Sequence, residues 1–116
     1  FHCALMQPAA DAMAKALADV TINAPAAPLV SNVLAAPITD PAEIRRRLVE
    51  QVTGTVRWRE SVAYMAGHGV TRFFEIGAGK VLSGLVKRIA EGAVGVSVGG
   101  PGDIAAAKEA LAAAKA

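Results

Sequence analysis

Cysteine and histidine are scarce in this sequence, with one Cys and two His among 116 residues. A single thiol cannot form an internal disulfide, and no Cys/His cluster has the spacing of metal ligands, so we expect neither a disulfide-stapled fold nor a metal centre. The reducing cytoplasm is the compartment in which such a chain is expected. A chain of this length is expected to fold as one domain or as part of one.

Long hydrophobic runs are missing as well. The longest stretch without a charged residue, Val20 to Thr39, contains Asn, Thr, Ser and several prolines, so we expect no membrane span and no membrane partner. The hydrophobic fraction of 53% is high because 26 residues are Ala, which favours helices and buries little area. The net charge of +2 is small, and no nucleic-acid partner is expected. Local basic clusters suit an acidic protein or a phosphorylated ligand, although solvated helix faces explain them more simply.

Helix and strand patterns alternate along the chain in the order typical of α/β proteins. This order predicts a parallel sheet with flanking helices, to which strands from outside the chain are expected to add. Thr55 and Asp103 are expected as the N-caps of the third and the last helix. The expected elements are helices over residues 5–20, 41–52, 56–66, 81–91 and from 104 onward, and strands over residues 29–33, 71–76 and 93–98.

The second expected helix has the clearest start signal in the sequence. Asp40 is placed as its N-cap, and Glu43 completes a capping box. Ile44, Leu48 and Gln51 follow at spacings of four and three and therefore share one face. Because a buried amide without a partner costs about 1–3 kcal/mol, Gln51 is expected to have a partner or a task.

Gly77–Lys80 lies between a predicted strand and a predicted helix, where phosphate-binding loops occur. The Walker pattern fails because Val81 follows the Lys, and the third glycine of the dinucleotide fingerprint is missing. A tight strand-to-helix turn accounts better for these glycines. A non-enzymatic nucleotide-binding module that uses the Gly77 loop remains an alternative.

Three further features of the sequence are predicted from local pattern. Cys3 is expected to be a small buried residue rather than a nucleophile, and His68 is expected in an exposed turn. The helix that follows the glycine loop is expected to bury Val81, Leu82, Leu85, Val86 and Ile89.

The sequence contains five ordered blocks of note: residues 1–9, 23–25 with 30–33, 48–52, 56–62 and 75–85. Together these blocks closely resemble the C-terminal part of bacterial malonyl-CoA:acyl carrier protein transacylases. The resemblance implies an α/β fold, in which residues 1–116 form the C-terminal part of the α/β-hydrolase-like large subdomain of an acyltransferase. It also implies that the N-terminal portion with the nucleophilic Ser is absent here, and that the fragment alone is inactive.

The resemblance implies ping-pong transfer of malonyl from malonyl-CoA, through an acyl-Ser intermediate, to the phosphopantetheine thiol of acyl carrier protein. The family's catalytic His falls on His2, whose side-chain type suits proton transfer near neutral pH. The family residue that orients this His through a backbone carbonyl falls on Gln51. Asn32 borders the same pocket, so it is expected to be a substrate-binding residue together with Phe1, and a contact from it to His2 is expected. No cofactor is implied beyond malonyl-CoA as substrate.

Substrate and partner preferences are implied in the same way. Phe1, directly before the His, resembles the malonyl-selective pattern, in which its bulk excludes a methyl branch; a methyl is worth only about 1–3 kcal/mol, so the selection is a bias. Lys87 and Arg88 are expected to attract the acidic carrier protein. An acyltransferase domain of a polyketide or fatty acid synthase is the alternative within this class.

Overall fold

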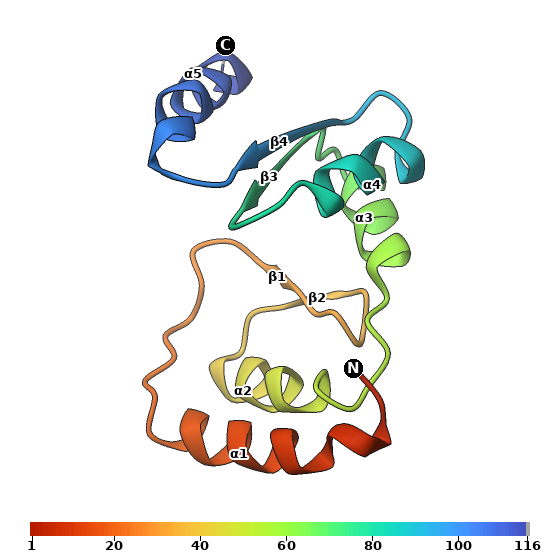
Figure 1. Ribbon diagram of the computed structural model, residues 1–116, viewed down its shortest axis with the longest axis vertical. Coiled ribbons are helices and arrows are strands. Elements are labelled where there is room, and N and C mark those ends of the chain that lie inside the picture. The colour runs from red at the N-terminus through yellow and green to blue at the C-terminus, as the bar shows by residue number, and fades with distance from the viewer. Residues whose placement is uncertain (116) are drawn as a thin grey trace. The chain divides into compact units, whose positions relative to one another are not determined.

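The computed structural model describes residues 1–115 (Figure 1). Side chains are described for residues 1–113. It divides into two compact units, Phe1–Ser61 and a second that begins at Val62. Helix α3 (Trp58–Gly67) contains the boundary. Within the described residues, no helix has both the length and the apolar character needed to cross a bilayer.

The first unit is built on two helices and a short hairpin. Arg45 of α2 donates to the carbonyl oxygens of Leu17 and, at 2.8 Å, Val20 at the end of α1, so the two helices are joined by hydrogen bonds as well as by packing. Ala10 and Ile44 are the buried residues of these helices. The elements of this unit are η1 (Ala4–Met6), α1 (Gln7–Ala18), β1 (Leu29–Val30), β2 (Pro37–Ile38) and α2 (Pro41–Glu50).

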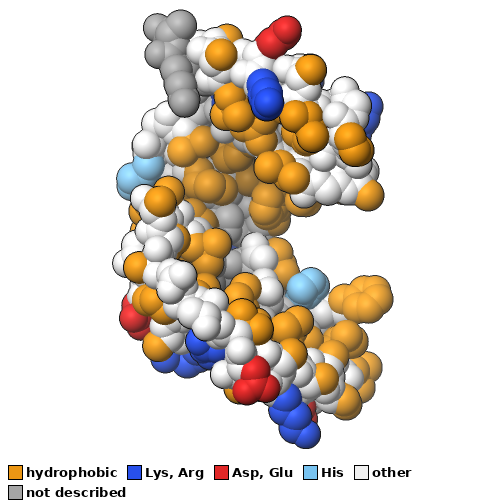
Figure 2. Space-filling model, turned by 90° about the vertical axis from the view of Figure 1, so that its left-hand side faces the viewer, with side chains coloured by type: hydrophobic (Ala, Val, Ile, Leu, Met, Phe, Trp, Pro, Cys, Tyr) orange, Lys and Arg blue, Asp and Glu red, His pale blue; other side chains and the backbone are white. Residues whose placement is uncertain are grey.

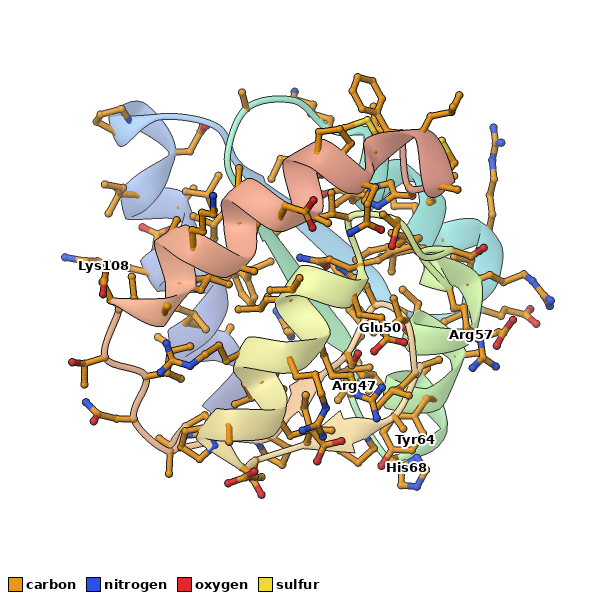
Figure 3. The ribbon with its side chains drawn as sticks, turned by 90° about the horizontal axis from the view of Figure 1, so that it is seen from below. Arg47, Glu50, Arg57, Tyr64, His68 and Lys108 are labelled. Atoms are coloured by element: carbon orange, nitrogen blue, oxygen red, sulfur yellow. The ribbon has the colours of Figure 1, made fainter. Side chains whose placement is uncertain are left out.

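Helix α2 begins where its capping signal predicts. The Asp40 carboxylate accepts a hydrogen bond of 3.1 Å from the backbone N–H of Glu43, which confirms the N-cap. The Glu43 side chain does not complete the box but faces Arg47 at 3.6 Å. Arg47 also donates to Glu50 at 2.6 Å (Figure 3), and this hydrogen bond raises the pKa of the guanidinium. The last turn of α2 is thus supported by ion pairs, and the helix ends at Glu50, two residues earlier than predicted.

The strand predicted over residues 29–33 is shorter and pairs differently. Only Leu29–Val30 is extended, and it pairs antiparallel with Pro37–Ile38, so the prediction of one three-stranded parallel sheet was wrong. The chain turns directly after β1, where Ala35 donates to the Ser31 carbonyl at 2.8 Å and Ser31 to the Ala36 carbonyl at 3.0 Å. Ala35 has a φ of +51°, a conformation that the sequence does not signal with a glycine.

The second unit contains the predicted parallel strands with flanking helices. β3 and β4 pair in parallel, with α4 as the crossover, and the register runs from Arg72 opposite Val94 to Ile76 opposite Val98. Val62 and Val86 are fully buried. The elements that follow α3 are β3 (Arg72–Ile76), α4 (Val81–Ile89), β4 (Val94–Val98), η2 (Pro101–Asp103) and α5 (Ile104–Lys115).

Glu75 ties the start of α4 to the sheet. Its carboxylate accepts hydrogen bonds from the Ser83 N–H at 2.9 Å, the Ser83 hydroxyl at 2.8 Å and the Leu82 N–H at 3.4 Å. These bonds to the charged form lower the pKa of Glu75. Ser97 of β4 donates to the Ser83 hydroxyl at 3.1 Å, so β3, β4 and α4 share one polar network.

The start of α3 differs from the prediction, whereas α5 begins at the predicted residue, Ile104. Thr55 is not the cap of α3, because the first helical hydrogen bond runs from Ser61 N–H to the Arg57 carbonyl at 2.9 Å. Asp103 directly precedes α5, and its carboxylate accepts from the Gly99 N–H at 2.9 Å.

The predicted buried stripe of α4 is only partly buried. Val81 is 73% and Leu82 38% exposed, whereas Ser83 and Val86 are the buried residues of the helix. The prediction for Val81 and Leu82 was therefore wrong within this chain. The buried place at the start of α4 goes to Ser83 because the Glu75 carboxylate binds it there.

Candidate active site

His2 is held by a backbone carbonyl of a distant residue. Its Nδ1 lies 2.6 Å from the carbonyl oxygen of Gln51, 49 positions along the chain. Because a carbonyl only accepts, Nδ1 carries the proton, and Nε2 of the neutral ring keeps a free lone pair. His2 has a φ of +58°, a backbone conformation that residues with a side chain rarely adopt and that recurs at functional sites. The imidazole is thus set in the tautomer that a general base needs.

Gln51 offers this carbonyl because it stands at the C-cap of α2. Its own N–H still bonds to the Arg47 carbonyl at 3.1 Å. The last carbonyl groups of a helix have no partner inside the helix, so the Gln51 oxygen is free to accept from a side chain.

Asn32 contacts Gln51. Its Nδ2 donates to Gln51 Oε1 at 2.8 Å, in a half-buried position. The partner predicted for the Gln51 amide is therefore present. The contact expected from Asn32 to His2 is instead made to Gln51, because the turn after β1 points the amide to the end of α2.

The other residues at the start of the chain are exposed. Phe1 is 98% exposed, and Cys3 is exposed, so its predicted burial was wrong. Within the described residues, none of the four serine hydroxyls bonds to His2: Ser61 Oγ donates to the Arg57 carbonyl, and Ser83 and Ser97 belong to the Glu75 network. Among the described residues, the His2 imidazole therefore has no serine hydroxyl as a partner.

The Gly77 loop makes a tight turn, as the sequence predicts. Gly77 and Gly79 have φ values of +140° and +92°, which favour glycine. A phosphate at the N-terminus of α4 would need the N–H groups of Leu82 and Ser83. The Glu75 carboxylate already occupies them. This geometry speaks against a nucleotide-binding loop.

Lys87 and Arg88 are exposed in the last turn of α4. Positive side chains there complement the negative end of the helix dipole.

His68 follows the C-terminal end of α3. It is exposed, as expected, and stacks on Tyr64 with ring centroids 4.1 Å apart (Figure 3). Its Nδ1 lies 2.8 Å from the Tyr64 carbonyl, so this imidazole caps a helix end.

An open apolar groove of about 620 Å³ lies in the second unit. Exposed hydrophobic side chains are plentiful on the molecular surface (Figure 2), and Ile76 in this groove is 83% exposed. Among its described lining residues only Lys108 is charged, so the groove lacks the acid and base groups of a catalytic site. The principal lining residues are Phe74, Ile76, Val98, Ile104, Ala107 and Leu111.

No family model matches the sequence. The chain is 47% identical over 108 residues to a malonyl CoA-acyl carrier protein transacylase of Escherichia coli (strain K12), which covers 93% of this chain and 35% of that protein. A crystal structure of an acyl-carrier-protein-S-malonyltransferase from Bartonella henselae matches with a TM-score of 0.87 and 49% identity, over 97% of this chain and 36% of that one.

A further solved structure holds an acyl carrier protein of a type II polyketide synthase in complex with its malonyl-transacylase. It matches with a TM-score of 0.80 and 39% identity, over 93% of this chain and 35% of that one. The chain spans about a third of the length of the relatives that it matches. Over nearly its whole length it is similar in sequence and in fold to part of malonyl-CoA:acyl carrier protein transacylases, so the resemblance stated from the sequence is confirmed.

Proposed function

We propose that this chain is the part of a malonyl-CoA:acyl carrier protein transacylase that supplies the general base, His2. The observation that carries the proposal is the hydrogen bond from His2 Nδ1 to the Gln51 carbonyl, in a chain 47% identical to such an enzyme. An imidazole with a fixed tautomer and a free Nε2 can take a proton from a hydroxyl and return it to a leaving group.

In the first half-reaction, Nε2 of His2 removes the proton of a serine hydroxyl supplied from outside these residues. The serine oxygen attacks the thioester carbonyl of malonyl-CoA, the C–S bond breaks, and Nε2–H protonates the departing CoA thiolate. The ring is positively charged between these steps, and the Gln51 carbonyl stabilises it through Nδ1–H.

The second half-reaction runs through the same groups in the opposite sense. Nε2 takes the proton of the phosphopantetheine thiol, the thiolate attacks the malonyl-serine ester, and Nε2–H returns a proton to the serine oxygen. Both half-reactions need only a base, a nucleophile and bound substrate, so the proposal includes no metal and no cofactor besides malonyl-CoA.

The remainder of the enzyme is proposed to complete both the fold and the site. The 83% exposure of Ile76 and the apolar groove at β3, β4 and α5 support this, because apolar surface of this kind is normally covered. We further propose that the parallel pair β3–β4 belongs to an α/β-hydrolase-like sheet that strands from the rest of the protein extend.

Phe1 is proposed to favour malonyl over methylmalonyl, and acyl carrier protein is the proposed acceptor. In the intact protein, Phe1→Ser should shift a competition between malonyl-CoA and methylmalonyl-CoA by about 10-fold or more towards the branched substrate. An unchanged ratio would show that Phe1 does not determine the specificity.

The intact mass of the native parent polypeptide distinguishes a stand-alone transacylase from a domain of a long multidomain synthase.

The proposed base is tested with His2→Ala in the intact protein that contains this chain. Malonyl transfer to acyl carrier protein should fall by about 10²–10⁴-fold, because the substitution removes general acid–base catalysis. Circular dichroism and the midpoint of thermal unfolding should stay close to those of the unsubstituted protein, since the His2 side chain is exposed. Transfer at a near-normal rate would show that another group is the base.

A further inference from the structure

Asn32 connects three parts of the candidate site. Its side chain donates to Gln51 Oε1 at 2.8 Å, its backbone carbonyl accepts from the Arg57 N–H at 2.8 Å, and Gln51 holds His2. We propose that Asn32 is a positioning residue of the transfer reaction, which fixes Gln51 and through it the tautomer and orientation of His2. The inference rests on the proposed function of His2 and assigns Asn32 a task other than substrate binding.

The loop that carries Asn32 is itself well fixed. Ser31 before it is 4% exposed, and its N–H and carbonyl bond to Ala36 and Ala35 across the turn. The Arg57 side chain adds a hydrogen bond of 3.1 Å to the Leu34 carbonyl. A side chain on so constrained a backbone loses little further entropy when it binds Gln51, so it can serve as a fixed reference point.

The end of α2 needs such a reference. Gln51 is the C-cap, and the backbone hydrogen bonds of the turn that follows go to the carbonyls of Val49 and Glu50, so they do not hold the Gln51 carbonyl in place. The Asn32 amide is the side-chain partner of Gln51, so it restrains the residue whose oxygen holds the imidazole. A misplacement of about 1 Å in a catalytic group can cost about 10²-fold in rate. Loss of the amide link should therefore reach His2, although Asn32 does not touch it.

The test uses two substitutions that break the link from opposite sides in the intact protein. Asn32→Leu keeps the size of the side chain and removes its donor, and Gln51→Met removes the amide but keeps the backbone carbonyl that holds His2. Each should lower kcat/KM for malonyl transfer by about 10–100-fold, with the fraction of acylatable enzyme and KM little changed. The double variant should lose no more than the worse single variant, because both remove the same link.

Two matched variants accompany these. Asn32→Asp should recover much of the lost rate, because the Gln51 amide can turn and donate to the carboxylate. Asn23→Leu makes the same change at an exposed asparagine of the same unit and should leave transfer unchanged. A merely structural role predicts instead that Asn32→Leu lowers the fraction of active enzyme and that the remaining enzyme transfers malonyl at the normal rate.

Nitrogen NMR of ¹⁵N-labelled His2 gives a readout that does not depend on activity. The unsubstituted protein should show the Nδ1–H tautomer, and Asn32→Leu and Gln51→Met should both increase the share of Nε2–H. Should the unsubstituted protein fail to transfer malonyl, the proposed function fails while this measurement still tests the link. An unchanged tautomer ratio together with unchanged kcat/KM in both variants overturns the positioning role.

Discussion

Two glycines of the second unit differ in what an added methyl group would meet. A Cβ on Gly95 would lie 2.8 Å from the Ser83 carbonyl oxygen, so Gly95→Ala should force β4 and α4 apart. We expect a loss of about 1–3 kcal/mol in the free energy of unfolding, measured by urea denaturation of the intact protein. Gly84→Ala is the control, because its Cβ would meet nothing within 4 Å and it lies inside α4, where Ala stabilises. Equal stability of the two variants would contradict the close approach of β4 to α4.

A single carboxylate makes the stability of the second unit depend on pH. Hydrogen bonds from Ser83 and Leu82 lower the pKa of Glu75 below its ordinary value of 4.5. In the pH range between the two pKa values the unfolded chain binds the proton and the folded chain does not. The stabilisation by Glu75 is therefore fully present above about pH 4.5 and is lost as the pH falls through the lowered pKa.

Glu75→Gln tests this pH dependence. The variant should be less stable than the unsubstituted protein at pH 7, and the difference in unfolding free energy should shrink as the pH falls below about 4.5. Denaturant titrations of the intact protein at several pH values measure the free energy of unfolding. The difference in this free energy between the variant and the unsubstituted protein is free of the contribution of the other carboxylates. A difference that stays constant over this range would show that the hydrogen bonds do not favour the charged form.

Helix α2 is capped by Asp40 at its N-terminus and ends at its C-cap, Gln51, in the candidate site. Asp40→Ala removes the N-cap and should cost about 0.5–2 kcal/mol of stability, whereas Asp40→Asn should cost little because the amide oxygen still accepts from the Glu43 N–H. Thermal or urea unfolding of the intact protein measures both. If Asp40→Asn destabilises as much as Asp40→Ala, the carboxylate acts through its charge and not as a cap.

Elements with local signals could be predicted from the sequence, and those set by distant contacts could not. The start of α2 follows from Asp40 and the residues just after it. The end of β1 depends on the turn that Ala35 closes with a positive φ, and alanine gives no sign of such a turn. Likewise, the apolar stripe of α4 gave no hint that the Glu75 carboxylate, from β3, would bind Ser83 there.

The candidate site shows the same limit at the scale of the whole molecule. His2 and Gln51 are 49 positions apart in the sequence, so no periodicity or spacing predicts their contact. The resemblance to a known family predicted it. The amide pattern of α2 did predict that Gln51 has a partner, and Asn32 is that partner. The sequence did not predict that Asn32 binds Gln51 instead of His2, because the turn after β1 decides where the Asn32 side chain points.

The proposed association with an acidic carrier protein would depend on the charge of the surface as a whole, so it is tested with charge reversals at two places. Lys87→Glu with Arg88→Glu should slow transfer to acyl carrier protein about 10-fold or more at low salt, mainly through the association rate, because both residues are exposed at the end of α4. Lys15→Glu with Arg46→Glu changes the net charge equally on other exposed helix positions and should slow transfer much less. In stopped-flow measurements, the association rates of the variants should become similar as the ionic strength rises, because salt screens exposed charges beyond about 10 Å at 0.1 M. Equal slowing by both pairs would assign the effect to net charge, and no slowing by either would exclude α4 from the carrier surface.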